Sequence, residues 1–178
     1  MKLPDLSRWR LAGVTALACA TVVLPMAAFA ATASSAAPAT AARCGTADLV
    51  VWMTYDQAAA GTMYYTLHFT NLSGHVCTLR GHPGVSAVSL RGSRIGQAAG
   101  WIRPGNGKLL TVRLRSGDSA TATLALTDVG VFSKSDCRQV TAAGLRVYPP
   151  GQRRSRVVGY PLRACSAAQG FLGAGIVQ

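Results

Sequence analysis

Three histidines spaced seven residues apart, His68, His75 and His82, are the first residues that could do chemistry. Imidazole is a common ligand of transition metals, so such a set could hold a metal ion. Seven is an odd interval, however, and successive side chains of a strand point to opposite faces. Glycine, serine and proline between the histidines also predict intervening turns. We therefore expect three surface histidines without a joint role, and no metal or other cofactor.

Nucleophilic and acid–base catalysis find little support in the residue pattern. The segment 84–88, GVSAV, lacks the second glycine of a serine nucleophile elbow. Residues 105–108, GNGK, lack the first glycine and the final hydroxyl residue of a phosphate-binding loop. The aspartates of the chain beyond residue 30 could supply a carboxylate pair for glycoside hydrolysis. They stand at expected strand starts and turns, where aspartate bonds its own backbone. We predict no catalytic residue.

Trp101 is the first binding candidate, because it lies in a glycine-bounded segment between Arg94 and Arg103. Tryptophan and arginine are the residue types that most often anchor a protein interface. The alternative is that Trp101 folds back and caps one end of the domain. The first interpretation predicts an exposed ring and the second a covered one.

A set of arginines forms the second binding candidate. Arg113 and Arg115 alternate with apolar residues, so they share the solvent face of an expected strand. Arg153, Arg154 and Arg156 form a cluster in an expected loop. Arginine offers planar, paired donors to phosphate and carboxylate groups. No aromatic residues interleave with this basic cluster, which argues against specific nucleic-acid binding. A plain solvated surface is the alternative interpretation.

Four cysteines follow the N-terminal region, Cys44, Cys77, Cys137 and Cys165. An even number in an exported chain indicates two disulfides, for which three connectivities are possible. The smallest spacing is 28 residues, so the close cysteine pairs of a zinc site are absent from the sequence. We predict Cys44–Cys77, which would tie the start of the domain to its central motif. We predict Cys137–Cys165 as the second pair, which would close the intervening segment into a loop.

The first thirty residues have the pattern of a secretory signal peptide. Three cationic residues precede an apolar run at 11–24, and residues 28–30 read A-x-A. We predict cleavage after Ala30 and no transmembrane segment afterwards. An uncleaved anchor is one alternative, because about twenty apolar residues can span a bilayer. Lipidation at Cys19 is the other, although the leucine before it stands one place too late for a lipobox.

The rest of the chain divides into a linker at 31–42 and a domain at 43–178. The linker is rich in alanine, serine, threonine and proline, a composition typical of a disordered segment. The net charge of the whole chain is +12, of which the first thirty residues contribute +2, and no glutamate occurs anywhere. A balance this basic attracts anionic surfaces. Arginine-rich sequences also arise from genomic base composition without any partner.

Alternation of apolar and polar residues with a period of two dominates the domain and predicts many short strands. The expected strands lie at 49–55, at 62–70, around Cys77, from 84 onward, and at 110–114, 119–127, 145–147, 157–162 and 171–177. We expect 110–114 and 119–127 to form a hairpin around the turn at 116–118. The most helix-like piece, 136–143, predicts a single turn. Short strands separated by turns predict a β-sandwich.

Two motifs resemble those of a known family. Residues 77–85, CTLRGHPGV, preceded by FTN at 69–71, resemble the core motif of the secreted actinobacterial family called domain of unknown function 4232. Residues 145–151, LRVYPPG, lie between the last two cysteines and match that family's later motif. The resemblance covers the chain from Cys44 onward. It implies an immunoglobulin-like β-sandwich in exported or lipid-anchored envelope proteins, without an assigned activity or catalytic residues.

The sequence therefore predicts an all-β, immunoglobulin-like antiparallel β-sandwich with two disulfides, exported to the cell envelope or beyond. We expect a non-enzymatic binding module whose partner is an anionic envelope polymer or an envelope protein. A secreted hydrolase acting on envelope polymers is the alternative. A deep pocket that brings together two aspartates, or His68 and an aspartate, would favour the hydrolase.

Overall fold

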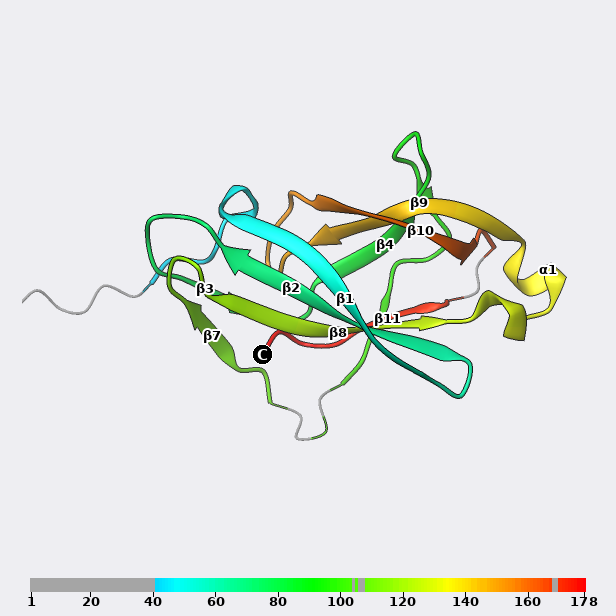
Figure 1. Ribbon diagram of the computed structural model, residues 1–178, viewed down its shortest axis with the longest axis horizontal. Coiled ribbons are helices and arrows are strands. Elements are labelled where there is room, and N and C mark those ends of the chain that lie inside the picture. Colours follow the sequence, from blue (N-terminus) through cyan, green and yellow to red (C-terminus); the bar gives the residue numbers. More distant parts are fainter. Residues whose placement is uncertain (1–40, 104, 106–107, 168–169) are drawn as a thin grey trace, which may run out of the picture. The chain divides into compact units, whose positions relative to one another are not determined.

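The computed structural model describes residues 41–178 except 104, 106, 107, 168 and 169, and over this range the protein is a β-sandwich with two disulfides (Figure 1). The predicted fold class is therefore confirmed. The predicted signal peptide at 1–30, with Cys19 in it, lies outside the described residues, as does the linker as far as residue 40. No helix in the described part of the chain is long and apolar enough to cross a membrane.

The larger sheet has five strands in the order β1-β2-β8-β11-β6. They are β1 (Leu49–Ala59), β2 (Thr62–Asn71), β8 (Ser119–Thr127), β11 (Leu172–Ala174) and β6 (Gly100–Trp101). Neighbours are antiparallel except the short parallel pair β11–β6. In β2, Tyr65, Leu67 and Phe69 are buried while the residues between them are less so. The alternation seen in the sequence thus places one face of β2 on the core.

The second sheet has four strands in the order β10-β9-β4-β5, and a third sheet consists of β3 and β7. Their bounds are β10 (Arg156–Cys165), β9 (Gln139–Tyr148), β4 (Gly84–Val88), β5 (Arg94–Ile95), β3 (Cys77–Arg80) and β7 (Thr111–Leu114). Figure 1 shows β4, β9 and β10 as one layer and β2, β8 and β11 as the other.

The core lies between the inner faces of these layers. Leu67 and Leu124 contribute from the five-stranded sheet, and Val85, Leu145 and Val147 contribute from the four-stranded sheet. Burying one such aliphatic side chain stabilises the fold by about 1.5–3 kcal/mol. The outer faces carry mostly polar side chains, together with exposed apolar ones such as Val50 and Trp52 of β1 and Val157 of β10.

Residues 110–114 and 119–127 do not form the predicted hairpin, because β7 pairs with β3 and β8 pairs with β2 and β11. Both edges of β8 are therefore occupied, and β7 must leave for another sheet. The corner is held by β2: the Gly117 amide donates to the Asn71 carbonyl at 2.7 Å, and the Asn71 amide donates to the Asp118 carbonyl at 2.9 Å. Gly117 has a φ of 88°, a value that favours glycine.

The helix-like piece predicted at 136–143 is mostly strand. One helical turn, α1 (Lys134–Cys137), is present, and residues 139–143 belong to β9. The Ser133 hydroxyl accepts a hydrogen bond from an amide of the first turn, and Arg138 ends the helix in a left-handed conformation with φ 43°. Two 3-10 turns, η1 (Thr46–Asp48) and η2 (Val129–Val131), complete the described elements.

Both predicted disulfides are confirmed. Cys44–Cys77 has a Cα–Cα distance of 4.8 Å and ties the start of the domain to β3. Cys137–Cys165 has a Cα–Cα distance of 4.5 Å and ties α1 to the end of β10. All four cysteines are fully buried, so the cross-links form part of the core.

Candidate functional site

Trp101 is exposed at the edge of the five-stranded sheet. The two residues of β6 pair with β11, and 75% of the Trp101 surface remains accessible. Its ring stacks on His82 with centroids 5.0 Å apart and planes inclined by 10°. The His82 Nε2 lies 3.1 Å from the Ile102 carbonyl oxygen, which orients the imidazole. Trp101 therefore does not cap the core, and the interpretation with an exposed ring is the one that fits.

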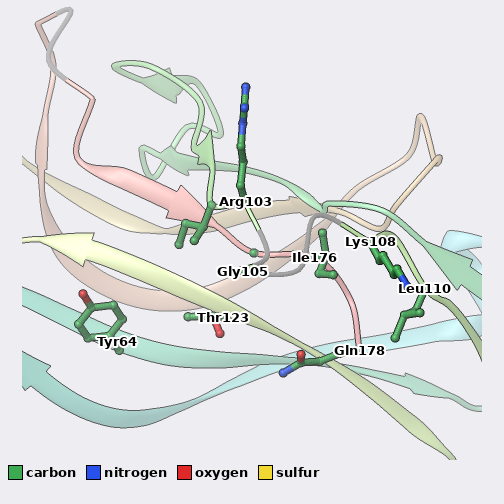
Figure 2. A pocket seen from close by; sticks show the side chains of 10 residues that line it. Tyr64, Arg103, Gly105, Lys108, Leu110, Thr123, Ile176 and Gln178 are labelled. Carbon is green, nitrogen blue, oxygen red and sulfur yellow. The ribbon is translucent and has the colours of Figure 1, made fainter.

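A groove of about 380 Å³ opens on the outer face of the same sheet (Figure 2). Two of its lining residues, Ile102 and Arg103, directly follow β6 in the chain. Tyr64 from β2 and Thr123 from β8 lie on its sheet side, since both alternate with buried residues. The residues lining it are Tyr64, Ile102, Arg103, Gly105, Lys108, Leu110, Thr123, Gly175, Ile176 and Gln178. Among them are two cations and no aspartate, cysteine or histidine.

Arg103 contributes less charge to this groove than its position suggests. Figure 2 shows its side chain pointing away from Thr123 and Gln178, with the guanidinium at the far end. The described residues of the groove therefore present apolar side chains, the hydroxyls of Tyr64 and Thr123, the Gln178 amide and the Lys108 ammonium. Trp101 directly precedes Ile102, which lines this groove. The binding candidate that the sequence predicts around Trp101 and Arg103 therefore lies next to a cavity.

The outer face of β1 and β2 carries an aromatic pair that the sequence analysis did not identify. Trp52 and His68 stand opposite each other in the register, with ring centroids 3.8 Å apart and planes inclined by 6°. The Trp52 indole donates to the Thr70 hydroxyl at 3.2 Å, and the Thr54 hydroxyl lies 3.0 Å from His68 Nε2. Burial lowers the pKa of His68, and the nearby Asp56 partly opposes this. His68 thus belongs to a structured surface and not to an isolated solvated position.

The aspartates form hydrogen bonds with residues close to them in the structure. Each accepts a hydrogen bond from a nearby amide or hydroxyl, and they are Asp48, Asp56, Asp118, Asp128 and Asp136. No ion pair joins an arginine to an aspartate among the described residues. Over the same residues, no three histidine, cysteine or acidic side chains are placed to hold one metal ion. Burial, with a hydrogen bond to Tyr160, raises the pKa of Tyr65 far above its usual value, so this phenol stays neutral.

The predicted arginine set is divided among several surfaces. Arg94 lines a cavity of about 270 Å³ together with Arg146. Arg153 and Arg154 are exposed, as predicted for a loop. Arg156 is exposed too, but its guanidinium donates to the carbonyls of η1 at 3.1 and 3.0 Å, which gives it a structural role. In the loop cluster, Arg153 and Arg154 are therefore exposed to solvent, whereas Arg156 anchors η1.

Arg113 joins two arginines that the sequence analysis did not select, Arg43 and Arg80. Thr78 of β3 pairs with Arg113 of β7 on one side and forms a bridge to Arg43 on the other. All three arginines are exposed. The signal was present in the alternation of 77–80, CTLR, whose first and third residues are buried. Arg43 could not be grouped with them without knowing the strand pairing. Arg115, beyond the end of β7, is exposed as well.

One family model matches the chain, over residues 44–175, and its description is "Domain of unknown function (DUF4232)". The matched range begins at the first disulfide cysteine and ends just beyond β11, so it coincides with the sandwich. No curated protein and no solved structure matches the chain.

Proposed function

Because the chain belongs to the family described as domain of unknown function 4232, its family assigns it no activity, and we propose a function from its charge and geometry. The protein is a non-enzymatic binding module of the cell envelope or the extracellular space. Its sandwich is immunoglobulin-like, and its source is an actinobacterium. Its ligands are anionic envelope polymers.

The observation that carries the proposal is that, over the described residues, no aspartate forms an ion pair with an arginine. The five aspartates of the domain bind local amides and hydroxyls. In the part of the chain that the structure describes, the arginine charges are therefore not neutralised by a neighbouring aspartate. The chain carries a net +12 with no glutamate, and the described domain holds most of that charge. Such a distribution produces a potential of several kT over part of a surface and attracts polyanions.

Two further observations support an extracellular place. Buried disulfides such as Cys44–Cys77 and Cys137–Cys165 form and persist in oxidising compartments. The N-terminal residues have the charge, apolar run and A-x-A pattern of a secretory signal. Envelope phosphate polymers and acidic glycans are the polyanions that an exported protein meets first.

The test is retention of the disulfide-bonded full-length protein on an immobilised poly(glycerol phosphate) column across a salt series. We expect retention at about 50 mM salt and release before about 1 M, because the Debye length falls to about 3 Å there. The change Arg153→Ser with Arg154→Ser should elute earlier than wild type. Arg156 is left intact, since it holds η1 in place.

A column carrying an uncharged glycerol polymer is the control for this experiment. Passage of the wild type through the phosphate column at about 50 mM salt would contradict the proposal. The exposed Trp101 and the groove beside it would then become the better candidate for a contact with an envelope protein.

A further inference from the structure

A small basic face spans β3, β7 and the segment of Arg43 that pairs with β3. The register places Arg43, Thr78 and Arg113 in one row across the strands, and Arg80 opposite Thr111 in the next row. Residues paired across strands point to the same side of a sheet. Cys77 and Leu79 of β3 are buried, so this row points to the opposite, outer side.

The strand pairing places three arginines around Thr78, of which Arg43 and Arg80 line the cleft described below. Adjacent strands lie about 4.8 Å apart, so the Cα atoms of Arg43 and Arg113 flank Thr78 at about 10 Å from each other. Arg80 lies two residues beyond Thr78, on the same side of β3. Long arginine side chains can converge over this distance, whereas their backbones cannot approach further.

A cleft of about 350 Å³ opens on this face. Its lining residues are Ala41, Arg43, Thr78, Arg80, Leu109, Thr111 and Pro150. Arg80 Nε donates a long hydrogen bond of 3.5 Å to the Leu109 carbonyl, and both residues line the cleft. Arg43 Nη1 lies against the turn at Gly151, where an added Cβ would come within 3.2 Å of it.

The two segments that carry Arg43 and Thr78 are held together by hydrogen bonds. The Thr78 hydroxyl donates to the Ala42 carbonyl at 3.3 Å, and Cys44 amide donates to the Thr78 carbonyl at 3.0 Å. The Cys44–Cys77 disulfide links the same two segments one residue away. Arg43 and Arg80 are therefore brought together in advance of any ligand, which reduces the entropy lost on binding.

We propose that this cleft binds a phosphate group, an inference that rests on the proposed function and identifies the chemical group it recognises. A single guanidinium fork satisfies a carboxylate, whereas a phosphate has enough oxygens to accept from two forks at once. Of the described residues that line the cleft, none is acidic and could compete with the ligand. The phosphate can belong to a wall polymer or to a lipid headgroup.

The first experiment titrates the ¹⁵N-labelled, disulfide-bonded protein with inorganic phosphate, against sodium chloride at equal ionic strength. We expect saturable shifts of the Thr78 and Thr111 amides with phosphate alone. The change Arg43→Lys with Arg80→Lys keeps the charge but removes both planar forks, so phosphate binding should weaken by about tenfold. Arg91→Lys with Arg163→Lys is the matched control, since both arginines are exposed and lie outside the cleft, and this protein should bind phosphate as wild type does.

The second experiment distinguishes the sources of the phosphate. The three proteins are compared on poly(glycerol phosphate) and on phosphatidylglycerol vesicles, with phosphatidylcholine vesicles as the low-charge reference. We expect the Arg43→Lys, Arg80→Lys protein to lose retention on the phosphate source that the cleft recognises. Thermal unfolding of each variant shows whether it is folded, and lysine at these exposed positions should leave the unfolding temperature unchanged.

The outcomes separate the cleft from the general proposal. Equal retention of all three proteins on both polyanions, with no saturable amide shifts, would overturn the cleft and leave polyanion binding in place. Saturable phosphate binding in the cleft without retention on any polymer or vesicle would support the cleft and contradict the proposed function.

Discussion

Asn71 is the residue on which the corner of the fold depends. Its side chain is fully buried, donates to the carbonyls of His75 and Leu114 at 2.9 and 3.2 Å, and accepts from the Ser73 amide and hydroxyl at 2.9 and 2.7 Å. Its backbone holds the turn between β7 and β8. One amide side chain thus connects the end of β2 to the end of β7, which explains an asparagine at the end of an otherwise apolar inner face.

We predict that Asn71→Ala lowers the free energy of unfolding by about 2–4 kcal/mol, because buried carbonyl and amide groups lose their partners. Ser73→Ala is the matched control, since it removes one partly exposed hydroxyl and should cost about 1 kcal/mol or less. Denaturant unfolding of both variants measures the difference. Equal stability of the two variants would show that the fold does not depend on the hydrogen bonds of the Asn71 side chain.

The β1–β2 hairpin shows how a strained residue can persist inside a stable element. Ala59 pairs with Thr62, so the loop has two residues, Ala60 and Gly61. Both have positive φ, 48° and 74°, as a type I′ turn requires. Glycine adopts this conformation freely, whereas alanine does so at a cost of about 1–2 kcal/mol. The long ladder of β1 with β2 offsets that cost.

We predict that Ala60→Asn stabilises the protein by about 1 kcal/mol, because asparagine tolerates the left-handed conformation. Gly61→Ala is the opposite control: its φ is unfavourable, and the new Cβ would lie 3.2 Å from Val131 Cγ1. Denaturant unfolding of the three proteins gives their free energies of unfolding, with one common dependence of that free energy on denaturant concentration used for all three. A loss of stability in Ala60→Asn would mean that the turn has another conformation.

The charge distribution is a property of the whole molecule. Arginines occur on β3, β5, β7, β9 and β10, while the aspartates stay with their local turns and strands. A compact domain holds these like charges closer together than the unfolded chain does. Self-repulsion therefore destabilises the folded state when screening is weak.

We predict that the free energy of unfolding rises when monovalent salt increases from about 0.01 M to about 0.15 M, as the Debye length shrinks from about 30 Å to about 8 Å. Retention on polyanions should fall over the same range, so one change of solvent moves the two quantities in opposite directions. Arg153→Ser with Arg154→Ser should show a weaker salt dependence of stability. A stability that is flat or falls with salt in the wild type would contradict this account.

Local patterns in the sequence determined the strands and the cross-links. Alternation along 62–70 and 119–127 predicted two strands with the correct buried faces, because a strand's side-chain period is a property of the strand itself. The positions of the four cysteines relative to the expected strands led to the correct prediction of both disulfides. The exposure of Arg113 followed from the same alternation.

Only the tertiary structure decided which strands pair and which surface residues meet. The turn at 116–118 resembles a hairpin turn, yet β2 and β11 occupy both edges of β8, and this competition between distant segments is not encoded in the turn. Likewise, Arg43 and Arg80 are 37 residues apart in the chain and line the same cleft because the segment of Arg43 pairs with β3 at Thr78. Side-chain period is local, whereas edge pairing depends on every strand that competes for the same hydrogen bonds, and for that reason the basic cleft could not be foreseen.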